Sequence, residues 1–361
     1  MKILKLYGHK ENTGGVVNFQ NALQVVTAKS LHRFYHYRTG KVLNNAFLSQ
    51  CIIRYLDQLW SYCYFPVFLI LLNPDVIEIN SSLRSKSFRR DRIYLKIAKF
   101  VKPSKKIILF NHGWDKEFKF FMTTHNRPRL VNYFKKFDFT IILADAFKRE
   151  IVALGVDSAN IQVMTTGVNI ADYAEFSRID RSNTIINILF LSRIEKTKGI
   201  AELITAIPQI VAKYENVRFL IAGTGPFLPI IKKSPIVRSF QKYIIFKGYV
   251  RGSDKIELFR NANIFVLPSF SEGCPVSVIE ALASGLPIVY TGVGALPDIL
   301  IDGENGLCVE SRSVDSLVAA LNYLLENPLK VKQMGAINQV YSAQFDLGNI
   351  QQKLESIYTT I

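Results

Sequence analysis

The stretch Ser271-Glu-Gly-Cys-Pro-Val-Ser-Val-Ile-Glu280 decides the fold class of this chain. An apolar run at 262–268 precedes it and predicts a buried strand, and the residues that follow Glu280 are typical of a helix ending at Gly285. Glu272 is therefore expected in a strand-to-helix loop, with Glu280 two turns along the helix. Such loops lie at the carboxyl edge of a parallel sheet, where open α/β folds bind ligands.

Gly273 and Pro275 in this stretch favour a close approach of the backbone to a ligand and the start of a helix. Two carboxylates at this spacing can accept hydrogen bonds from a sugar on one side and a ribose on the other. The alternative for the pair alone is a solvated loop acid and a helix-surface acid.

Short β-rich apolar runs alternate with helical patterns along the whole chain. This alternation is typical of parallel sheets with right-handed crossovers, so the sequence predicts an α/β protein in two halves. The expected strands lie at 2–6, 76–79, 107–111 and 139–143, and then at 186–191, 217–222, 244–247, 263–267 and 287–290.

A polar segment between Thr166 and Asn183 separates the halves, and the length of 361 residues suits about two domains. The prediction assigns 1–168 to the first domain and 169–344 to the second. The last stretch, at about 345–361, is expected to form a helix that returns to the first domain.

Positive charge is concentrated in the first half of the chain. Residues 1–170 hold 26 Lys and Arg against 11 Asp and Glu, whereas 171–361 hold 19 against 18. The four cysteines show no short paired spacing, so they indicate neither a zinc site nor a redox motif, and a reducing cytoplasm fits. The apolar part of the N-terminus is too short for a signal peptide and predicts a first strand.

The charge is densest in 84–106, where ten basic residues face Asp91 alone, and apolar residues recur there at helical spacing. This pattern predicts a basic amphipathic helix that docks on an anionic membrane surface. The alternative is a solvated helix whose apolar stripe packs on its own domain. No nucleic-acid motif supports nucleic acid as the partner.

The uncharged stretch 58–74 is shorter than the ~20 apolar residues of a spanning helix, and Pro66 interrupts it. It predicts a buried helix that leads to the strand at 76–79. A dip into one leaflet stays open as the alternative.

Further candidates for anion binding lie just after predicted strands. Arg193 and Lys198 follow the strand at 186–191 in a loop that opens a helix, where backbone N–H groups and the helix dipole favour anions. Gly14 and Gly15 follow the first strand and suit a turn that approaches a phosphate, although a glycine pair is often only a turn.

His112 follows the strand at 107–111 and precedes Gly113. A lone histidine is usually structural or solvated. Its place at the carboxyl end of a strand, in a loop with glycine, makes it a candidate ligand-binding residue. Asp115 follows closely and is a weaker candidate for orienting it.

Several segments of the chain resemble family 4 retaining glycosyltransferases, the glycosyl transferases group 1, which have the GT-B fold of two Rossmann-like domains facing across a cleft. The stretch 272–280 resembles the family's E-x7-E signature. The other resembling segments occur in the family's order, and they are Asn111-His-Gly-Trp-Asp115, Thr166-Gly-Val-Asn169, Leu191-Ser-Arg-Ile-Glu-Lys-Thr-Lys-Gly199, Phe219-Leu-Ile-Ala-Gly-Thr-Gly-Pro226 and Phe246-Lys-Gly-Tyr-Val250.

The resemblance implies a role for each matching residue. Glu272 and His112 would contact the transferred sugar, and Glu280 the ribose hydroxyls. The remaining donor-binding positions would be Gly14, Gly15, Arg193, Lys198, Gly248, Tyr249, Val250, Gly273, Cys274 and Pro275. Family members usually carry a large residue at the position of Cys274, so the small side chain here leaves the donor sugar open.

The resemblance further implies a metal-independent, retaining transfer from a UDP- or GDP-sugar, with no cofactor. The expected acceptor is a lipid-linked or other saccharide in capsule, O-antigen or exopolysaccharide synthesis, on the inner face of the cytoplasmic membrane. A sugar epimerase or phosphorylase of the same architecture, or an inactive lipid- or polysaccharide-binding scaffold, are the alternatives.

Overall fold

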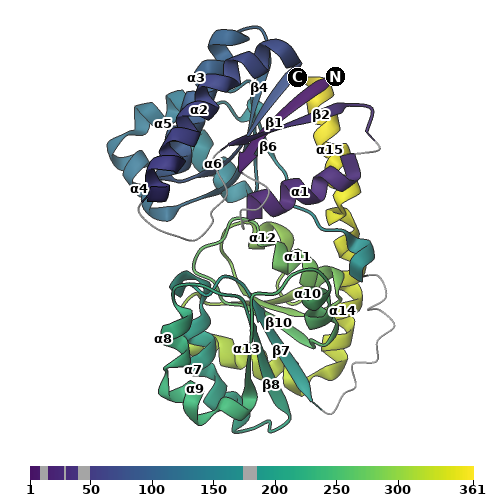
Figure 1. Cartoon of the computed structure of the whole chain (residues 1–361). Helices are drawn as coiled ribbons and strands as arrows, with labels where there is room; N and C mark the ends of the chain where they lie inside the picture. The colour runs from purple at the N-terminus through teal and green to yellow at the C-terminus, as the bar shows by residue number, and fades with distance from the viewer. Residues whose placement is uncertain (9–14, 28–29, 40–48, 174–184) are drawn as a thin grey trace. The chain divides into compact units, whose positions relative to one another are not determined.

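A computed structural model describes residues 1–8, 15–27, 30–39, 49–173 and 185–361. The chain forms two compact units (Figure 1). Unit 1 comprises residues 1–166 and 347–361, and unit 2 comprises 167–346. The sequence had placed the division two residues later, and had placed the return of the chain to the first unit at about 345.

Unit 1 is built on a parallel sheet with the strand order β2-β1-β3-β4-β5-β6 in its described part. Its central strands are buried on both faces, as expected for a parallel sheet covered by helices on each side. The strands are β1 (Lys2–Gly8), β2 (Arg33–Thr39), β3 (Val76–Leu83), β4 (Lys106–Trp114), β5 (Phe139–Ile142) and β6 (Ile161–Val163).

Helices cover the faces of this sheet (Figure 1). They are α1 (Gly15–Thr27), α2 (Ser49–Leu72), α3 (Ser85–Val101), α4 (Lys116–His125), α5 (Arg127–Phe134), α6 (Asp145–Ala153) and α15 (Leu347–Thr360). The C-terminal helix α15 packs on α1, and the Tyr358 hydroxyl donates a short hydrogen bond to Glu78 in the sheet. The prediction that the tail returns to the first domain is therefore confirmed.

The prediction of a buried helix at 58–74 is wrong. Helix α2 begins earlier, at Ser49, and ends at Leu72. Within 56–72, where side-chain burial is described, it buries one narrow face through Phe65 and Leu69. Its other face is apolar and exposed. Of the helices that the structure describes, none combines the length and the apolar character needed to cross a bilayer.

Unit 2 is built on a second parallel sheet, with the order β12-β11-β10-β7-β8-β9. Its strands are β7 (Ile186–Leu191), β8 (Val217–Ala222), β9 (Ile244–Gly248), β10 (Ile264–Leu267), β11 (Ile288–Thr291) and β12 (Gly306–Val309). Strand β10, next to the centre, is buried at every residue. The α/β fold class with two parallel sheets is therefore confirmed.

The helices of unit 2 include several short ones in the loops. They are η3 (Lys196–Lys198), α7 (Ile200–Val211), α8 (Leu228–Lys232), α9 (Pro235–Ser239), α10 (Gly252–Arg260), α11 (Val276–Ala283), α12 (Leu296–Ile299), α13 (Val314–Glu326) and α14 (Pro328–Ser342). Helix α11 begins directly after Pro275, so Glu272 lies in the loop and Glu280 in the second turn of the helix, as predicted.

Three strands were absent from the sequence prediction, namely β2, β6 and β12. Each lies at an edge of its sheet. Strand β2 reads Arg-Phe-Tyr-His-Tyr-Arg-Thr and is mostly half-exposed, β6 has three residues, and β12 has four. The apolar runs of β6 and β12 are too short to identify a strand by pattern, and basic residues interrupt the aromatic residues of β2.

Candidate active site

The predicted residues of unit 2 lie in loops at the carboxyl ends of three strands. Arg193 and Lys198 follow β7, Gly248, Tyr249 and Val250 lie at the end of β9, and Glu272 to Pro275 follow β10. Strands β10 and β7 are direct neighbours in the sheet. The loops that follow them therefore meet, and their side chains form the centre of the candidate site.

Lys198 and Glu272 form an ion pair at this meeting point. The Lys198 Nζ lies 2.8 Å from Glu272 Oε1 and also donates to the Ser271 carbonyl at 3.2 Å. The Ser269 hydroxyl donates to the same carboxylate oxygen at 2.7 Å. Both side chains are largely buried, so removal of either one would leave the other as an uncompensated buried charge.

Glu272 has one carboxylate oxygen available for a ligand. Both hydrogen bonds described above go to Oε1, and in the described part of the chain Oε2 accepts none. A carboxylate held in this way can accept hydrogen bonds from ligand hydroxyls through Oε2 while Lys198 neutralises its charge.

Glycines allow the loops to meet. A side chain at Gly199, where φ is +70°, would place its Cβ 2.0 Å from the Pro268 carbonyl oxygen. At Gly225 the corresponding distance to the Ile194 carbonyl oxygen is 2.4 Å. The backbones of the loops after β7, β8 and β10 are therefore in direct contact, and only glycine fits at these contacts.

Arg193 does not join the Lys198 pair. Its guanidinium is more than half exposed and lies 2.7 Å from Glu195 Oε1. It is available at the rim of the site, because an exposed ion pair of this kind is weak and exchanges readily.

Glu280 lies on the buried side of helix α11 and is 4% exposed. Lys255, on α10, forms a short ion pair with its carboxylate. Burial raises the pKa of Glu280, and the ammonium of Lys255 together with a hydrogen bond from Tyr173 opposes that rise. Burial and the Glu280 charge raise the pKa of the Tyr173 hydroxyl, so it stays a proton donor.

The remaining predicted donor-binding positions of unit 2 lie at the carboxyl ends of β9 and β10. Gly248 has φ +66°, which a turn at the end of β9 requires, and its carbonyl accepts from Gly223. Tyr249 and Val250 follow, and the Tyr249 ring is exposed. Gly273 and Cys274 precede α11, and the Gly273 carbonyl accepts from Ala295 at 2.8 Å.

The candidate residues in unit 1 are Gly14, Gly15 and His112. Gly14 lies outside the described residues, and Gly15 is the first residue of α1, with open space where a side chain would lie. His112 was expected just after its strand, but it lies within β4, which continues to Trp114. Its ring stacks on Phe110, and its Nε2 lies 2.8 Å from Asn80 Oδ1.

Sequence reasoning did not find Lys255, Tyr173, Ser269 or Asn80. Lys255 and Tyr173 are distant in sequence from Glu280, and no spacing rule connects them. Asn80 carried a usable signal, since β3 changes from apolar residues to Asn80-Ser81-Ser82 at its carboxyl end. In the ranges that the structure describes, no group of three His, Cys, Asp or Glu side chains could hold a metal ion.

Residues 174–340 match the family described as Glycosyl transferases group 1. This match covers most of unit 2, so unit 2 carries the domain described by that family.

Two curated relatives illustrate the similarity. The phosphatidyl-myo-inositol mannosyltransferase of Mycolicibacterium smegmatis is 29% identical over 54% of this chain and 50% of its own length. The capsular polysaccharide biosynthesis glycosyltransferase CapM of Staphylococcus aureus is 26% identical over 61% of each chain. The chain thus spans about half the length of the curated relatives it matches.

A solved structure covers the whole chain. HepE of Anabaena, in complex with UDP and glucose, aligns over 100% of both chains with a TM-score of 0.77 and 16% identity. This likeness confirms the GT-B fold of two α/β domains.

Gly199 offers a test of the loop contact. Gly303 is a matched control, because its φ of +77° is similar but no atom lies within 4 Å of an added Cβ. We expect Gly303→Ala to lower the free energy of unfolding by about 1–2 kcal/mol, the cost of a positive φ. Gly199→Ala adds the displacement of the β10 loop, for a total of roughly 2–5 kcal/mol.

Urea unfolding of the two variants measures this difference. Equal losses in both would contradict the view that backbone contact, rather than backbone conformation alone, makes glycine necessary at position 199.

Proposed function

We propose that this protein is a retaining glycosyltransferase that uses a nucleotide-sugar donor, a UDP- or GDP-sugar, with no cofactor. The Lys198–Glu272 pair is the observation that carries the proposal. The pair places a cation next to a carboxylate that has an available oxygen. In a nucleotide sugar, a diphosphate is bonded to a sugar that carries hydroxyl groups. One such ligand can therefore bind the cation through its diphosphate and the carboxylate through its hydroxyls.

In this proposal the diphosphate is bound by Lys198 and Arg193. Lys198 supplies a point charge within the loop and Arg193 a planar fork at its rim, which suits two adjacent phosphoryl groups. As the bond between the sugar and the diphosphate breaks, negative charge grows on the leaving phosphate, and fixed cations stabilise it. We therefore propose that the reaction needs no metal ion.

Glu272 and Glu280 have different roles in this proposal. Glu272 Oε2 accepts from hydroxyls of the donor sugar. Glu280, whose charge is balanced by Lys255, accepts from the ribose. The acceptor oxygen bonds to the anomeric carbon on the face that the diphosphate leaves, and the acceptor proton passes to the departing phosphate oxygen.

Titration calorimetry with UDP and GDP tests the diphosphate site. We expect saturable binding of one of them by the wild type, weakened about 10–100-fold by Lys198→Met through the loss of a charge-assisted contact. Lys213→Met is the control, since Lys213 is exposed beyond α7. Unchanged binding by Lys198→Met would contradict the assignment.

Glu272→Gln separates binding from transfer. The variant should retain diphosphate binding but lose transfer by about 100-fold, because the amide is neutral and its NH2 group donates hydrogen bonds where the carboxylate only accepted them.

Transfer by the wild type should persist in the presence of a metal chelator, and the product should keep the anomeric configuration of the donor. An epimerised sugar nucleotide without transfer would favour the epimerase alternative, and absence of any saturable nucleotide binding would favour the scaffold.

We also propose that the acceptor is lipid-linked, as in surface polysaccharide synthesis, and that unit 1 docks on the inner, anionic face of the cytoplasmic membrane. The support comes from two neighbouring helices. Lys86, Arg89, Ile93, Lys96 and Phe100 share one exposed face of α3, and Phe100 is 88% exposed. In the described residues none of the three cations on this face forms an ion pair.

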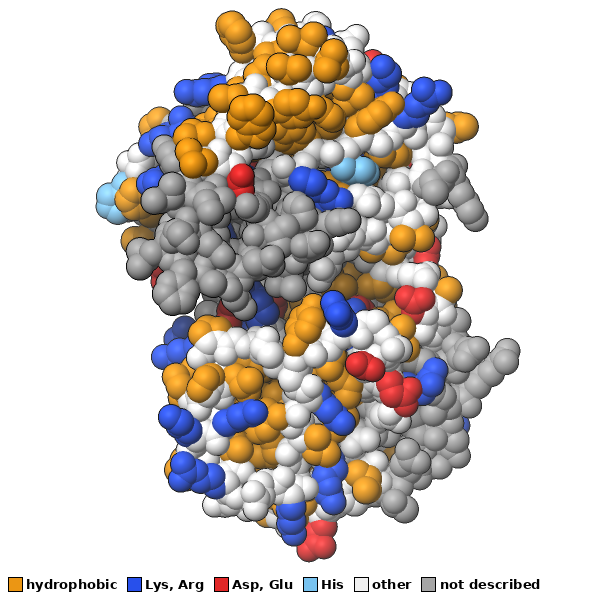
Figure 2. All heavy atoms as spheres, viewed as in Figure 1, with side chains coloured by type: hydrophobic (Ala, Val, Ile, Leu, Met, Phe, Trp, Pro, Cys, Tyr) orange, Lys and Arg blue, Asp and Glu red, His pale blue; other side chains and the backbone are white. Residues whose placement is uncertain are grey.

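Helix α2 packs beside α3 and exposes an apolar face. Its exposed residues are Leu56, Leu59, Trp60, Cys63, Tyr64, Val67, Ile70 and Leu71, with Trp60 and Leu71 about three-quarters exposed at 74% and 76%. Figure 2 shows hydrophobic side chains gathered over this part of unit 1, with Lys and Arg at its margins. An apolar face with a basic margin suits an interfacial helix that lies in the plane of an anionic leaflet.

Cosedimentation with vesicles tests the docking. We expect binding to phosphatidylglycerol-rich vesicles, little binding to phosphatidylcholine, and loss at high salt. Replacing Lys86, Arg89 and Lys96 by Gln should weaken binding about 100-fold, at roughly 1 kcal/mol for each charge. Trp60→Ser with Leu71→Ser should weaken it without changing the salt dependence.

The control replaces three exposed lysines of unit 2 by Gln, namely Lys213, Lys232 and Lys332. An equal loss in this control would show that net charge alone attracts the vesicles. Light scattering that finds a stable dimer, dissociated by the Trp60 and Leu71 changes, would instead assign the apolar face to a second copy of the chain.

A further inference from the structure

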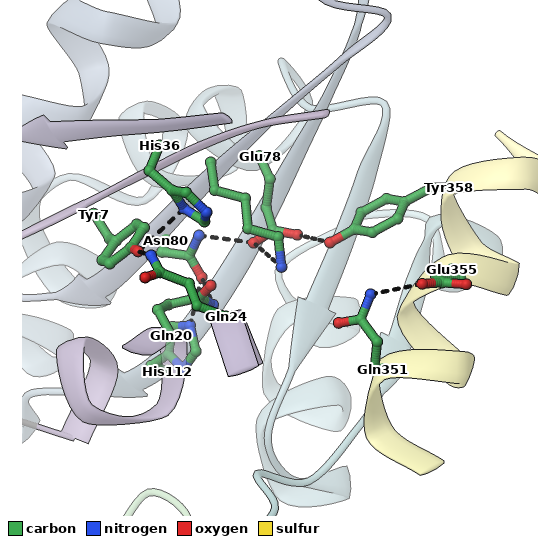
Figure 3. Close-up of polar contacts among 11 residues, drawn as sticks. Tyr7, Gln20, Gln24, His36, Glu78, Asn80, His112, Gln351, Glu355 and Tyr358 are labelled. Atoms are coloured by element: carbon green, nitrogen blue, oxygen red, sulfur yellow. Dashed lines mark hydrogen bonds and ion pairs between the residues drawn. The ribbon is translucent and has the colours of Figure 1, made fainter. Parts of the chain in front are cut away.

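A line of buried polar contacts crosses unit 1 from the C-terminal helix to His112 (Figure 3). The Tyr358 hydroxyl of α15 donates to Glu78 Oε2, and Glu78 Oε1 accepts from Asn80 Nδ2 at 2.7 Å. Asn80 Oδ1 then lies 2.8 Å from His112 Nε2. Each step joins side chains that are almost fully buried, apart from the half-buried His112 ring.

The orientation of the Asn80 amide follows from its neighbours. An ionised carboxylate only accepts hydrogen bonds, so the Asn80 nitrogen must face Glu78. The Asn80 oxygen then faces the other side, where it accepts from Gln20 Nε2 at 2.7 Å as well as meeting His112. The reversed amide would set an oxygen against the carboxylate and a nitrogen against the Gln20 donor.

This orientation determines which nitrogen of His112 carries the proton. Because Asn80 Oδ1 is an acceptor, His112 Nε2 must donate, and in a neutral ring Nδ1 is then an acceptor. Among the residues that the structure describes, Nδ1 has no hydrogen-bond partner. We propose that Asn80, oriented by Glu78, is a positioning residue that holds His112 as the neutral Nε2–H tautomer and so presents Nδ1 to a hydroxyl of the substrate.

Two groups from other elements contact the Glu78 carboxylate. Lys5 Nζ lies 3.7 Å from its Oε1, and both side chains are buried. The Lys5 ammonium also lies over the rings of Phe34 and Tyr358, at 5.1 and 5.7 Å from their centroids. The ammonium and the Tyr358 hydroxyl both favour the ionised carboxylate, which the orientation of Asn80 requires.

The surroundings of His112 also favour a neutral ring. Burial, together with the positive charge of Lys5 on β1, lowers the pKa of His112 to about 3. Phe110 and Phe19 contact the ring from β4 and α1 and carry no charge. Glu78 on β3 is the acidic group on this side, but Asn80 separates it from the imidazole.

A neutral acceptor selects its ligand. Nδ1 in this state binds an O–H or N–H group and offers nothing to a phosphate oxygen. His112 therefore contributes to recognition of a sugar hydroxyl and leaves the diphosphate to other residues. This assignment of the ligand rests on the proposed function, whereas the tautomer itself rests only on the contacts within unit 1.

Nitrogen NMR of the full-length protein labelled with ¹⁵N-histidine tests the tautomer directly. The chain holds five histidines, and His112→Gln identifies the His112 signals. We expect the wild type to show Nε2 protonated and Nδ1 unprotonated, with no titration between pH 5 and 8. A protonated Nδ1, or a titration near the ordinary pKa of about 6.5, would overturn the proposal without any variant.

Two substitutions test the part played by Asn80. Asn80→Ala should give a mixture of the two tautomers and lower kcat roughly tenfold, the value of one hydrogen bond, with the donor KM within about twofold. Asn80→Asp should set a carboxylate against Nε2 and bring the His112 titration into the range from pH 5 to 8. The control is Gln351→Met, which removes another buried amide of unit 1 outside the line and should change neither tautomer nor kcat.

The outcomes separate this proposal from the proposed function. The expected tautomer in a protein without transferase activity would support the positioning role and contradict the function. Normal transfer with a single unchanged tautomer in Asn80→Ala would contradict the positioning role and leave the function intact.

Discussion

The ion pair between Lys198 and Glu272 is the contact on which the candidate site depends. It joins the loop after β7 to the loop after β10, and both partners are buried, so neither can leave without stranding the other. In the proposed function a diphosphate gives Lys198 a second anion, and the Ser269 hydroxyl still donates to Glu272 if Lys198 moves toward the diphosphate. The ion pair thus satisfies both side chains without a ligand.

Unit 1 uses buried charge for a different purpose. Lys5 and Glu78 lie in neighbouring strands, and Glu78 is linked to the His112 ring through the neutral amide of Asn80. A carboxylate in direct contact with the ring would favour an imidazolium, whereas an amide oxygen favours a neutral ring. Because the Asn80 side chain stands between Glu78 and His112, the ring meets an amide oxygen, and the neutral form of His112 is favoured.

The sequence predicted the parts of the structure that local pattern controls. The central strands, helix α11 with its two glutamates, the basic helix α3 and the C-terminal helix all follow from apolar spacing and turn residues. Edge strand β2 was missed because basic residues interrupt its aromatic ones. Helix α2 was wrongly expected to be buried because composition does not show which face of an apolar helix is covered. Lys255 and Tyr173 meet Glu280 only through the fold, so no motif contains them.

The glycine contacts at 199 and 225 have a consequence for how such a site diversifies. They fix the loops through main-chain atoms alone, so the framework does not depend on the identity of the nearby side chains. Cys274, next to Glu272, lies in one of these loops at an intermediate depth. A substitution at such a position changes the surface of the loop while the main-chain framework persists, so the scaffold and the side chains that line it can evolve separately.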